Sequence, residues 1–244
     1  MPQIRAVITD YIGTLASVRS YNLEASMNTL RDALLDVGFQ TEKQQFLDAY
    51  KKAHEKYRAV RYGDLREVTN AVWVSETLSS LGHKVHVEDP RMKEALNIFF
   101  QDFVDSLELR PYATALLEKI AETCKLGLVS NFTYAPVVYS SLRKLGISDF
   151  FNAIVVSEEN GWRKPHQKIF QDTLQQLHVK AEEAVFIGDS PMEDIKGALQ
   201  AGLKTIFVSS QFYTLNDLQS SGQNPHLTVD SLEQIYQNLK KIVT

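Results

Sequence analysis

Short apolar runs alternate with longer amphipathic stretches along most of this chain. Five of the runs are rich in Val and Ile and lack sustained polar alternation, as is typical of parallel strands that are covered on both faces. We expect strands at residues 4–9, 126–129, 153–157, 184–187 and 205–208. Three stretches between the later runs carry apolar side chains at three- and four-residue spacing, and we expect helices at 135–145, 166–177 and 192–201. This alternation predicts an α/β fold with a doubly wound parallel sheet.

One long segment, residues 18–107, departs from the alternation. It contains no convincing strand, and its periodicity predicts four helices, at 23–37, 43–62, 66–81 and 90–106. We therefore expect a small helical cap domain that is inserted after the first strand and sits above that strand's carboxyl end. The remaining residues, 1–17 and 108–244, are expected to form the Rossmann-like core domain that contains the sheet.

Composition and charge narrow the possible functions. Of 244 residues, 44% are hydrophobic and 23% are charged, which is ordinary for a globular protein. The net charge of −4 argues against a general nucleic-acid binder, and no apolar run approaches the roughly 20 residues of a membrane span. The N-terminal stretch lacks the features of a signal peptide, and the single cysteine, Cys124, cannot form an internal disulfide bond. We expect a cytoplasmic protein that acts on a small molecule, with no signal for its oligomeric state.

The first candidate for chemistry is the carboxylate that ends the first apolar run. Ligands of open α/β sheets bind at the carboxyl ends of the strands, so the residues that follow each strand are the ones to consider. Asp10 occupies this place, and Gly13 permits a tight loop directly after it. A carboxylate there can act as a nucleophile and form an aspartyl-phosphate. The alternative is an Asp that only caps the following turn.

Polar and basic residues follow the second and third runs. Ser130 and Asn131 can hydrogen-bond the oxygens of a phosphoryl group, although both residue types are also common at turns and helix N-caps. Lys164 follows the third run and can neutralise a carboxylate and a phosphate that lie close together. The alternative is a solvated surface lysine.

Two carboxylates follow the fourth run, Asp189 at its end and Asp194 a little further on. Such a pair suits Mg²⁺, a hard cation that prefers oxygen ligands and keeps several waters. Taken alone, Asp189 also fits a cap, and Asp194 fits a favourable charge in the first turn of a helix. Together the four strand ends supply a nucleophile, a hydroxyl clamp, a cation and a metal site. Capping residues are not expected to form that set by chance.

These motifs resemble those of the haloacid dehalogenase (HAD) superfamily, and the similarity spans nearly the whole chain. The matching motifs are Asp10-x-Ile12-Gly13-Thr14, Ser130-Asn131, Lys164-Pro165 and Gly188-Asp189 with Asp194. The helical insertion is similar to the first type of cap domain in this superfamily, which implies that it closes over the substrate and selects it. The resemblance implies a hydrolase with Mg²⁺ as its cofactor.

The resemblance also implies a role for each matching residue. Asp10 is expected to attack the substrate. Ser130 and Asn131 are expected to bind the transferred group, and Lys164 to bind it and steady its charge. Thr14 is expected to assist catalysis through hydrogen bonds near the site. The implied Mg²⁺ ligands are Asp10, the backbone carbonyl of Ile12, and Asp189, with Asp194 in support.

The chain departs from the superfamily pattern at Ile12. Phosphatases of this superfamily carry Asp at this place, where it protonates the leaving oxygen and later activates water. Such general acid-base catalysis typically contributes about 10²–10⁴-fold, and an isoleucine cannot supply it. We therefore expect a phosphatase-like hydrolase of a small phosphorylated metabolite, with weakened or rerouted acid-base catalysis. Cap side chains that could substitute for the missing Asp are Glu24, Glu55 and His54.

Three alternatives stay open. A 2-haloacid dehalogenase also lacks the second Asp but needs no Mg²⁺, so the Asp189–Asp194 pair argues against it. Its cationic pocket would come from cap arginines such as Arg19, Arg58 and Arg61. A phosphonate hydrolase requires a cap lysine that forms an imine, for which the chain offers Lys51, Lys52 and Lys56. The last alternative is a non-catalytic binding protein, against which the clustered charges argue because their desolvation is costly.

Overall fold

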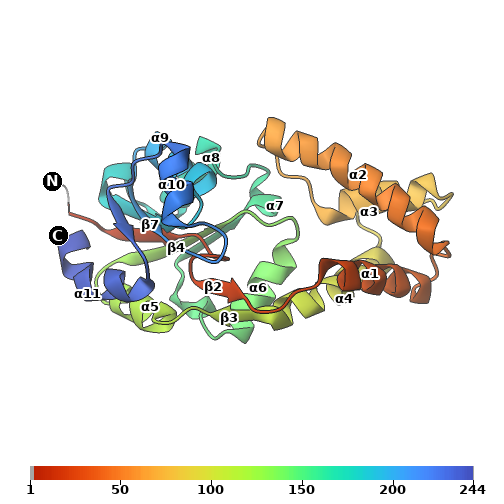
Figure 1. Cartoon of the computed structure of the whole chain (residues 1–244), viewed down its shortest axis with the longest axis horizontal. Coiled ribbons are helices and arrows are strands. Elements are labelled where there is room, and N and C mark those ends of the chain that lie inside the picture. Colours follow the sequence, from red (N-terminus) through yellow and green to blue (C-terminus); the bar gives the residue numbers. More distant parts are fainter. Residues whose placement is uncertain (1–2, 244) are drawn as a thin grey trace.

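The computed structural model describes residues 3–243 and has an α/β fold (Figure 1). Its main sheet has six strands in the order β5-β4-β1-β6-β7-β8, and all neighbouring strands are parallel. The chain adds strands outward on both sides of β1, as in a doubly wound sheet. The predicted fold class is therefore confirmed. The strands are β1 (Ala6–Thr9), β4 (Lys125–Ser130), β5 (Ala153–Val156), β6 (Ala184–Gly188), β7 (Lys204–Val208) and β8 (Leu227–Val229).

Helices cover both faces of the sheet, which explains why the strands are apolar along nearly their whole length. Strand β1 shows the division, because Val7 belongs to one hydrophobic cluster and its neighbours Ala6 and Ile8 belong to another. Helices α5, α6 and α11 pack on the first face, and α8 and α9 pack on the second (Figure 1). Their bounds, with those of α7 and α10, are α5 (Ala113–Ala121), α6 (Ala135–Lys144), α7 (Ser157–Asn160), α8 (Gln167–Leu177), α9 (Lys196–Gln200), α10 (Leu215–Ser221) and α11 (Leu232–Val243).

The inserted segment folds into four helices that lie beyond the carboxyl ends of the strands (Figure 1). They are α1 (Leu23–Asp36), α2 (Lys43–Gly63), α3 (Asn70–Ser80) and α4 (Pro90–Ser106). Their apolar faces share a hydrophobic cluster to which Leu34, Phe46 and Trp73 contribute. Tyr134, just before α6, and Val137 within it join the same cluster, so the four helices also pack against the sheet-bearing part.

A two-stranded antiparallel pair connects the helical segment to the rest of the chain. Strand β2 (Ala16–Val18) pairs with β3 (Leu107–Leu109), with Ser17 opposite Glu108. Strands of three residues are too short to produce a clear hydrophobic period, so the sequence did not reveal them. The predicted domain boundaries, at residues 17/18 and 107/108, fall inside this pair. The independence of the two parts as domains stays a prediction.

Three sequence predictions about helices and strands need correction. The helix expected over residues 66–81 begins only at Asn70, because Arg66 forms an antiparallel bridge with Trp162 instead. The helix expected over 192–201 opens with a single π-helical turn, Pro191–Ile195, before α9. Strand β8 and the helices α5, α7, α10 and α11 were not among the expected elements, and α7 takes Ser157, which was expected to end the third strand. Across residues 3–243, no helix is both long enough and apolar enough to span a bilayer.

Candidate active site

Asp10 lies directly after β1, at the carboxyl edge of the sheet. Its backbone N–H donates to the carbonyl of Ile187 in β6 (2.9 Å), so the residue is fixed by the sheet's own hydrogen bonding. The side chain is 7% exposed, and its Oδ1 accepts a hydrogen bond from Nζ of Lys164 at 2.6 Å. Its Oδ2 is buried and has no hydrogen-bond partner among the described residues. One oxygen of Asp10 is thus held in place, and the other is left without a partner.

Lys164 is buried beneath the site, and three oxygens surround its ammonium group. Its Nζ lies 2.6 Å from Asp10 Oδ1, 2.7 Å from Asp194 Oδ1 and 2.9 Å from the carbonyl oxygen of Val129. Burial disfavours the charged ammonium, but the carboxylates of Asp10 and Asp194 outweigh it and raise the pKa of Lys164. The residue therefore stays protonated. Its interpretation as a solvated surface lysine is wrong, because it is only 1% exposed.

Asp194 organises the loop after β6. Its Oδ2 accepts hydrogen bonds from the backbone N–H groups of Asp189 (3.1 Å) and Ser190 (2.9 Å). The carboxylate packs so tightly on Gly188 that a Cβ atom there would lie 2.5 Å from Asp194 Oδ2. A Cβ at Gly13, which has φ +105°, would lie 2.2 Å from Asp189 Oδ2. Both glycines are therefore required by the close approach of backbone to carboxylate.

Three carboxylates converge at this edge of the sheet. One oxygen from each of Asp10, Asp189 and Asp194 can be chosen so that all three lie within 4.8 Å of one another. Burial raises the pKa of Asp189 and of Asp194 well above the usual range, and the negative charge of Asp10 adds to both shifts. A hard divalent cation fits this donor set, because all three residues offer carboxylate oxygens that lie close enough together to share one ion.

The remaining predicted residues lie around the same point. Ser130, which ends β4, and Ile12 line one small cavity together with Asp10. Thr14 is fully buried, and its hydroxyl lies 3.5 Å from Asp189 Oδ1. The structure thus brings together all eight residues that the sequence singled out, and their catalytic roles stay predictions.

The amide of Asn131 holds the backbone of Lys164 and the carboxylate of Glu193. Its Oδ1 accepts from the N–H of Lys164 (2.7 Å), and its Nδ2 donates to the Lys164 carbonyl (3.0 Å) and to Glu193 Oε2 (2.9 Å). An amide NH₂ has two hydrogens, and both are engaged. This geometry favours a positioning role for the Asn131 side chain over direct contact with substrate.

Two functional candidates were missed by the sequence analysis. Ser210 donates a 2.6 Å hydrogen bond to Asp189 Oδ2, and it follows β7, the one predicted strand whose carboxyl end carried no predicted site residue. Arg110 donates 2.6 Å hydrogen bonds to the carbonyl oxygens of Gly13 and Ser209. It thereby joins the loop after β1 to the loop after β7.

A buried ionic network connects the helical segment with the site. Glu67, whose side chain is 0% exposed, accepts from Arg61 Nε (2.6 Å) and Ser157 Oγ (2.5 Å) and lies 3.5 Å from Arg163 Nη1. Arg163 in turn donates to Glu193 Oε1 (2.9 Å). Burial opposes the charge of Arg163, but Glu193 and Glu67 outweigh it and raise the pKa of the guanidinium. Arg163, the residue before Lys164, thus forms an ion pair with each part of the molecule.

The cap residues proposed as substitutes or alternatives are engaged elsewhere or absent from the cavity lining. His54 stacks on Tyr50 and packs edge-on against Trp73. Lys56 forms an ion pair with Glu76, and this hydrogen bond raises the pKa of Lys56. Three further pairs involve the cap arginines: Arg61 with Glu67, Arg19 with Glu108, and Arg58 over the ring of Tyr62. Glu24, Glu55, Lys51 and Lys52 do not line the cavity that contains Asp10.

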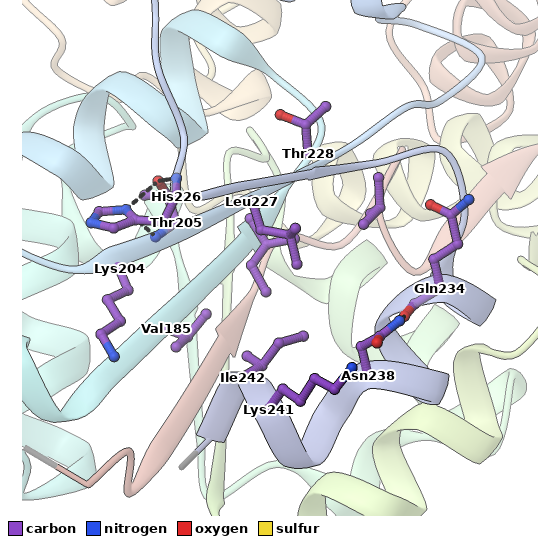
Figure 2. Close-up of a pocket in the computed structure, with 12 residues that line it drawn as sticks. Val185, Lys204, Thr205, His226, Leu227, Thr228, Gln234, Asn238, Lys241 and Ile242 are labelled. Carbon is purple, nitrogen blue, oxygen red and sulfur yellow. Dashed lines mark hydrogen bonds between the residues drawn. The ribbon is translucent and has the colours of Figure 1, made fainter. Parts of the chain in front are cut away.

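The cavity at the site is small and acidic, with a volume of about 100 Å³. It is lined by Asp10, Ile12, Ser130, Asn131, Asp189, Ser190, Glu193, Asp194, Phe212 and Tyr213. A larger cavity of about 750 Å³ lies elsewhere, among β6, β7, β8 and α11 (Figure 2). There Lys204 begins β7, and the ring of His226 hydrogen-bonds Thr205, so this cavity is at the amino ends of the strands. Because ligands of open α/β sheets bind at the carboxyl ends of the strands, the smaller cavity is the candidate active site.

The fold and the clustered carboxylates define a doubly wound α/β protein with a candidate site at the carboxyl ends of its parallel strands. A sequence model of the haloacid dehalogenase-like hydrolase family matches residues 43–208, more than half of the chain. The chain therefore belongs to the haloacid dehalogenase-like hydrolases, and the family resemblance of its motifs is confirmed. Asp10 lies outside the matched residues, so its assignment rests on the motif and on the geometry above.

Relatives extend the match to almost the whole chain. A glyceraldehyde 3-phosphate phosphatase of Methanopyrus kandleri is 28% identical, and the match covers 98% of this chain and 98% of that protein. The pyrimidine 5'-nucleotidase YjjG of Escherichia coli is 28% identical over 199 residues, which cover 76% of this chain and 85% of that protein. Both are hydrolases by name, in agreement with the family.

A solved structure is similar over its full length. The crystal structure of a 2-haloacid dehalogenase from Pseudomonas syringae pv. Tomato superposes with a TM-score of 0.69 and 23% identity. The superposition covers 98% of this chain and 99% of that one. At this level of identity the likeness concerns the fold and carries no information on the reaction.

Proposed function

We propose that this chain is a Mg²⁺-dependent phosphatase that hydrolyses small phosphate monoesters with Asp10 as its nucleophile. The names of the two relatives, a glyceraldehyde 3-phosphate phosphatase and a pyrimidine 5'-nucleotidase, denote enzymes that act on small phosphorylated molecules. Their similarity supports phosphoryl chemistry for this chain. The arrangement of charges in the site supports it independently.

The observation that carries the proposal is the acidity of the small cavity. Four carboxylates line it, those of Asp10, Asp189, Glu193 and Asp194, and no basic side chain does. Lys164 and Arg163 lie behind this lining and offset two of the four negative charges. A divalent cation would offset the other two. An anionic substrate is therefore expected to enter only when such a cation is bound, which separates this site from a metal-free dehalogenase.

The arrangement around Asp10 suits a covalent mechanism. Lys164 occupies Oδ1, so Oδ2 is free to form a bond to phosphorus. The bond between phosphorus and the ester oxygen breaks, and that oxygen leaves with its electron pair. Water then attacks the phosphorus of the aspartyl-phosphate, which releases phosphate and restores the carboxylate. Ser130 lines the cavity, and in this proposal its hydroxyl donates to a phosphoryl oxygen.

Mg²⁺ would be held by Asp10, the backbone carbonyl of Ile12, and Asp189, with Asp194 in support. When bound, it supplies positive charge that neutralises the phosphoryl oxygens. The residues of the chain do the rest of the positioning. Asp194 fixes the backbone of Asp189, Ser210 fixes one of its carboxylate oxygens, and Asn131 fixes the backbone of Lys164.

Ile12 shapes the choice of substrate. It lines the cavity beside Asp10 but has no proton to give to the leaving oxygen. The departing alkoxide must then take its proton from water. Substrates whose leaving groups are stable as anions need this proton less, so the enzyme is expected to favour good leaving groups. In this proposal the helical segment acts as the cap, and the buried ion pair between Glu67 and Arg163 links its position to the residue before Lys164.

The proposal is tested with p-nitrophenyl phosphate and with a phosphate-trapping experiment. Hydrolysis should require Mg²⁺, stop with EDTA, and be lost in Asp10→Asn. Acid quenching during turnover should leave phosphate on the peptide that contains Asp10. The matched control is Asp36→Asn, an exposed residue at the end of α1, which should keep full activity.

Two results would overturn the proposal. One is phosphate release at an unchanged rate in EDTA or in Asp10→Asn. The other is halide release from 2-chloropropionate in EDTA, which would establish the dehalogenase alternative. A phosphonate hydrolase would instead show imine trapping by borohydride at a cap lysine. The ion pair and raised pKa of Lys56 argue against that outcome, since imine formation needs the neutral amine.

A further inference from the structure

The size of the acidic cavity limits what it can hold. Pockets that enclose a whole small-molecule ligand usually measure roughly 300–1,000 Å³. The cavity at Asp10 measures about 100 Å³, and all but three of its lining residues are polar or charged at the side chain. It can accept a phosphoryl group and little more. The leaving group of a monoester must therefore lie at the mouth of the cavity.

Two aromatic side chains line this cavity and are at the same time open to solvent. Phe212 is 48% exposed and Tyr213 is 36% exposed, and both line the same cavity as Asp10 and Ser130. Single exposed apolar side chains are ordinary, but neighbouring ones that are rimmed by polar residues commonly mark a binding surface. The third apolar lining residue, Ile12, continues this surface inward to the nucleophile.

The loop that carries the two rings is held rigidly. The Ser210 hydroxyl accepts hydrogen bonds from the backbone N–H groups of Phe212 (2.9 Å) and Tyr213 (3.1 Å) while it donates to Asp189 Oδ2. Gln211 bonds both the N–H and the carbonyl of Val18 in β2, at 2.9 Å and 3.0 Å. A fixed loop presents its aromatic rings at little cost in conformational entropy, as suits recognition.

We infer that Phe212 and Tyr213 form an aromatic subsite for the leaving group, so that the preferred substrates are phosphate monoesters whose alcohol carries a planar aromatic ring close to the phosphate. This inference rests on the proposed phosphatase function and adds the substrate class to it. The ring of the substrate stacks on the two exposed side chains while the phosphoryl group enters the acidic cavity. Specificity then comes from the sheet-bearing part as well as from the helical segment.

The test compares 2-phenylethyl phosphate with propyl phosphate, in the full-length protein with Mg²⁺. Both release a primary alkoxide, so a difference in kcat/KM reports contact with the ring and not the ease of protonation. Aromatic pairing predicts a preference of roughly five- to tenfold for the phenylethyl ester in the wild type. Phe212→Ala and Tyr213→Ala should each reduce this preference, and the double variant should abolish it.

The matched control is Leu215→Ala, which removes a 37%-exposed side chain on the neighbouring helix α10 that does not line the cavity. It should keep the wild-type preference. Equal kcat/KM for the two esters in the wild type would overturn the inference. So would an equal loss for both esters in the aromatic variants, which would indicate contact with the helical segment instead. If Asp10→Asn still hydrolyses either ester, the proposed function itself fails, and the two failures are thereby distinguished.

Discussion

Nζ of Lys164 lies 2.6 Å from Oδ1 of Asp10, and this contact is the buried electrostatic centre of the site. Lys164→Met would leave Asp10 and Asp194 buried without their common cation. Loss of one partner from a buried ionic cluster typically costs about 3–5 kcal/mol of unfolding free energy. We expect a loss of that size in chemical denaturation together with the loss of phosphatase activity.

The control for this prediction is Lys168→Met. Lys168 pairs with Asp172 one helical turn away on the exposed side of α8. Exposed pairs of this kind contribute about 0.3–0.5 kcal/mol, so the variant should be close to wild type. Equal destabilisation by the two substitutions would show that the Lys164 cluster has no special energetic role.

Removal of metal should destabilise the protein through the carboxylates. Asp10, Asp189 and Asp194 are buried within one small volume, and a bound cation stabilises the folded state by mass action. At a Mg²⁺ concentration of about one hundred times Kd, this linkage adds roughly 2.7 kcal/mol. Mg²⁺ should therefore raise Tm in the wild type and raise it much less in Asp189→Asn. NaCl at matched ionic strength is the control, and an equal rise in the variant would contradict the assigned site.

Ile12→Asp should restore proton donation to the leaving oxygen. General acid catalysis is worth about 10²–10⁴-fold, and its benefit is greatest for poor leaving groups. We expect kcat/KM to rise by roughly a hundredfold for alkyl phosphates and by much less for p-nitrophenyl phosphate. Ile12→Asn is the matched control, because the asparagine side chain has nearly the size and polarity of aspartate but no acidic proton. A similar gain in both variants would attribute the effect to polarity and not to proton transfer.

The strands and the acidic site could be read from the sequence for one physical reason. A strand that is covered on both faces must be apolar throughout, and β1 and β6 are followed directly by Asp10 and Asp189. Because the strands are parallel, their carboxyl ends meet at one edge of the sheet and carry these residues with them. The same rule, applied to β7, would have found Ser210.

Other parts of the site leave no such pattern. Arg110 acts through the backbone oxygens of Gly13 and Ser209, and a carbonyl acceptor carries no residue-type signature in the sequence. The start of α3 was misplaced because the preceding residues bond to Gly161 and its neighbours, which lie far away along the chain. A long-range contact thus overrode a plausible local helix, as tertiary packing often does.

The buried pair between Arg163 and Glu67 should couple the helical segment to the site. Both side chains are almost fully buried, at 3% and 0% exposure, so their interaction is poorly screened by solvent. A double-mutant cycle with Arg163→Met and Glu67→Gln should give a coupling energy of about 1–3 kcal/mol in unfolding experiments. The same cycle on Arg19 and Glu108, an exposed pair at 3.8 Å, should give less than about 0.5 kcal/mol. A coupling no larger than that of the exposed pair would refute the proposed link.

His54 should make the helical segment less stable in mild acid. Its partial burial, followed by the charges of Arg61 and Arg58, lowers the pKa of His54 from 6.5, and Glu55 only partly offsets this effect. The unfolded chain therefore binds a proton at His54 more readily than the folded chain does. As the pH falls from 6.5 through the lower pKa of the folded state, the free energy of unfolding decreases. Hydrogen exchange in α2 and α3 should report this loss of protection between about pH 7 and pH 5, a range that brackets the ordinary histidine pKa. The loss should be larger in the wild type than in His54→Gln. Parallel pH profiles of the wild type and the variant would show that His54, which packs against Trp73, has no such effect.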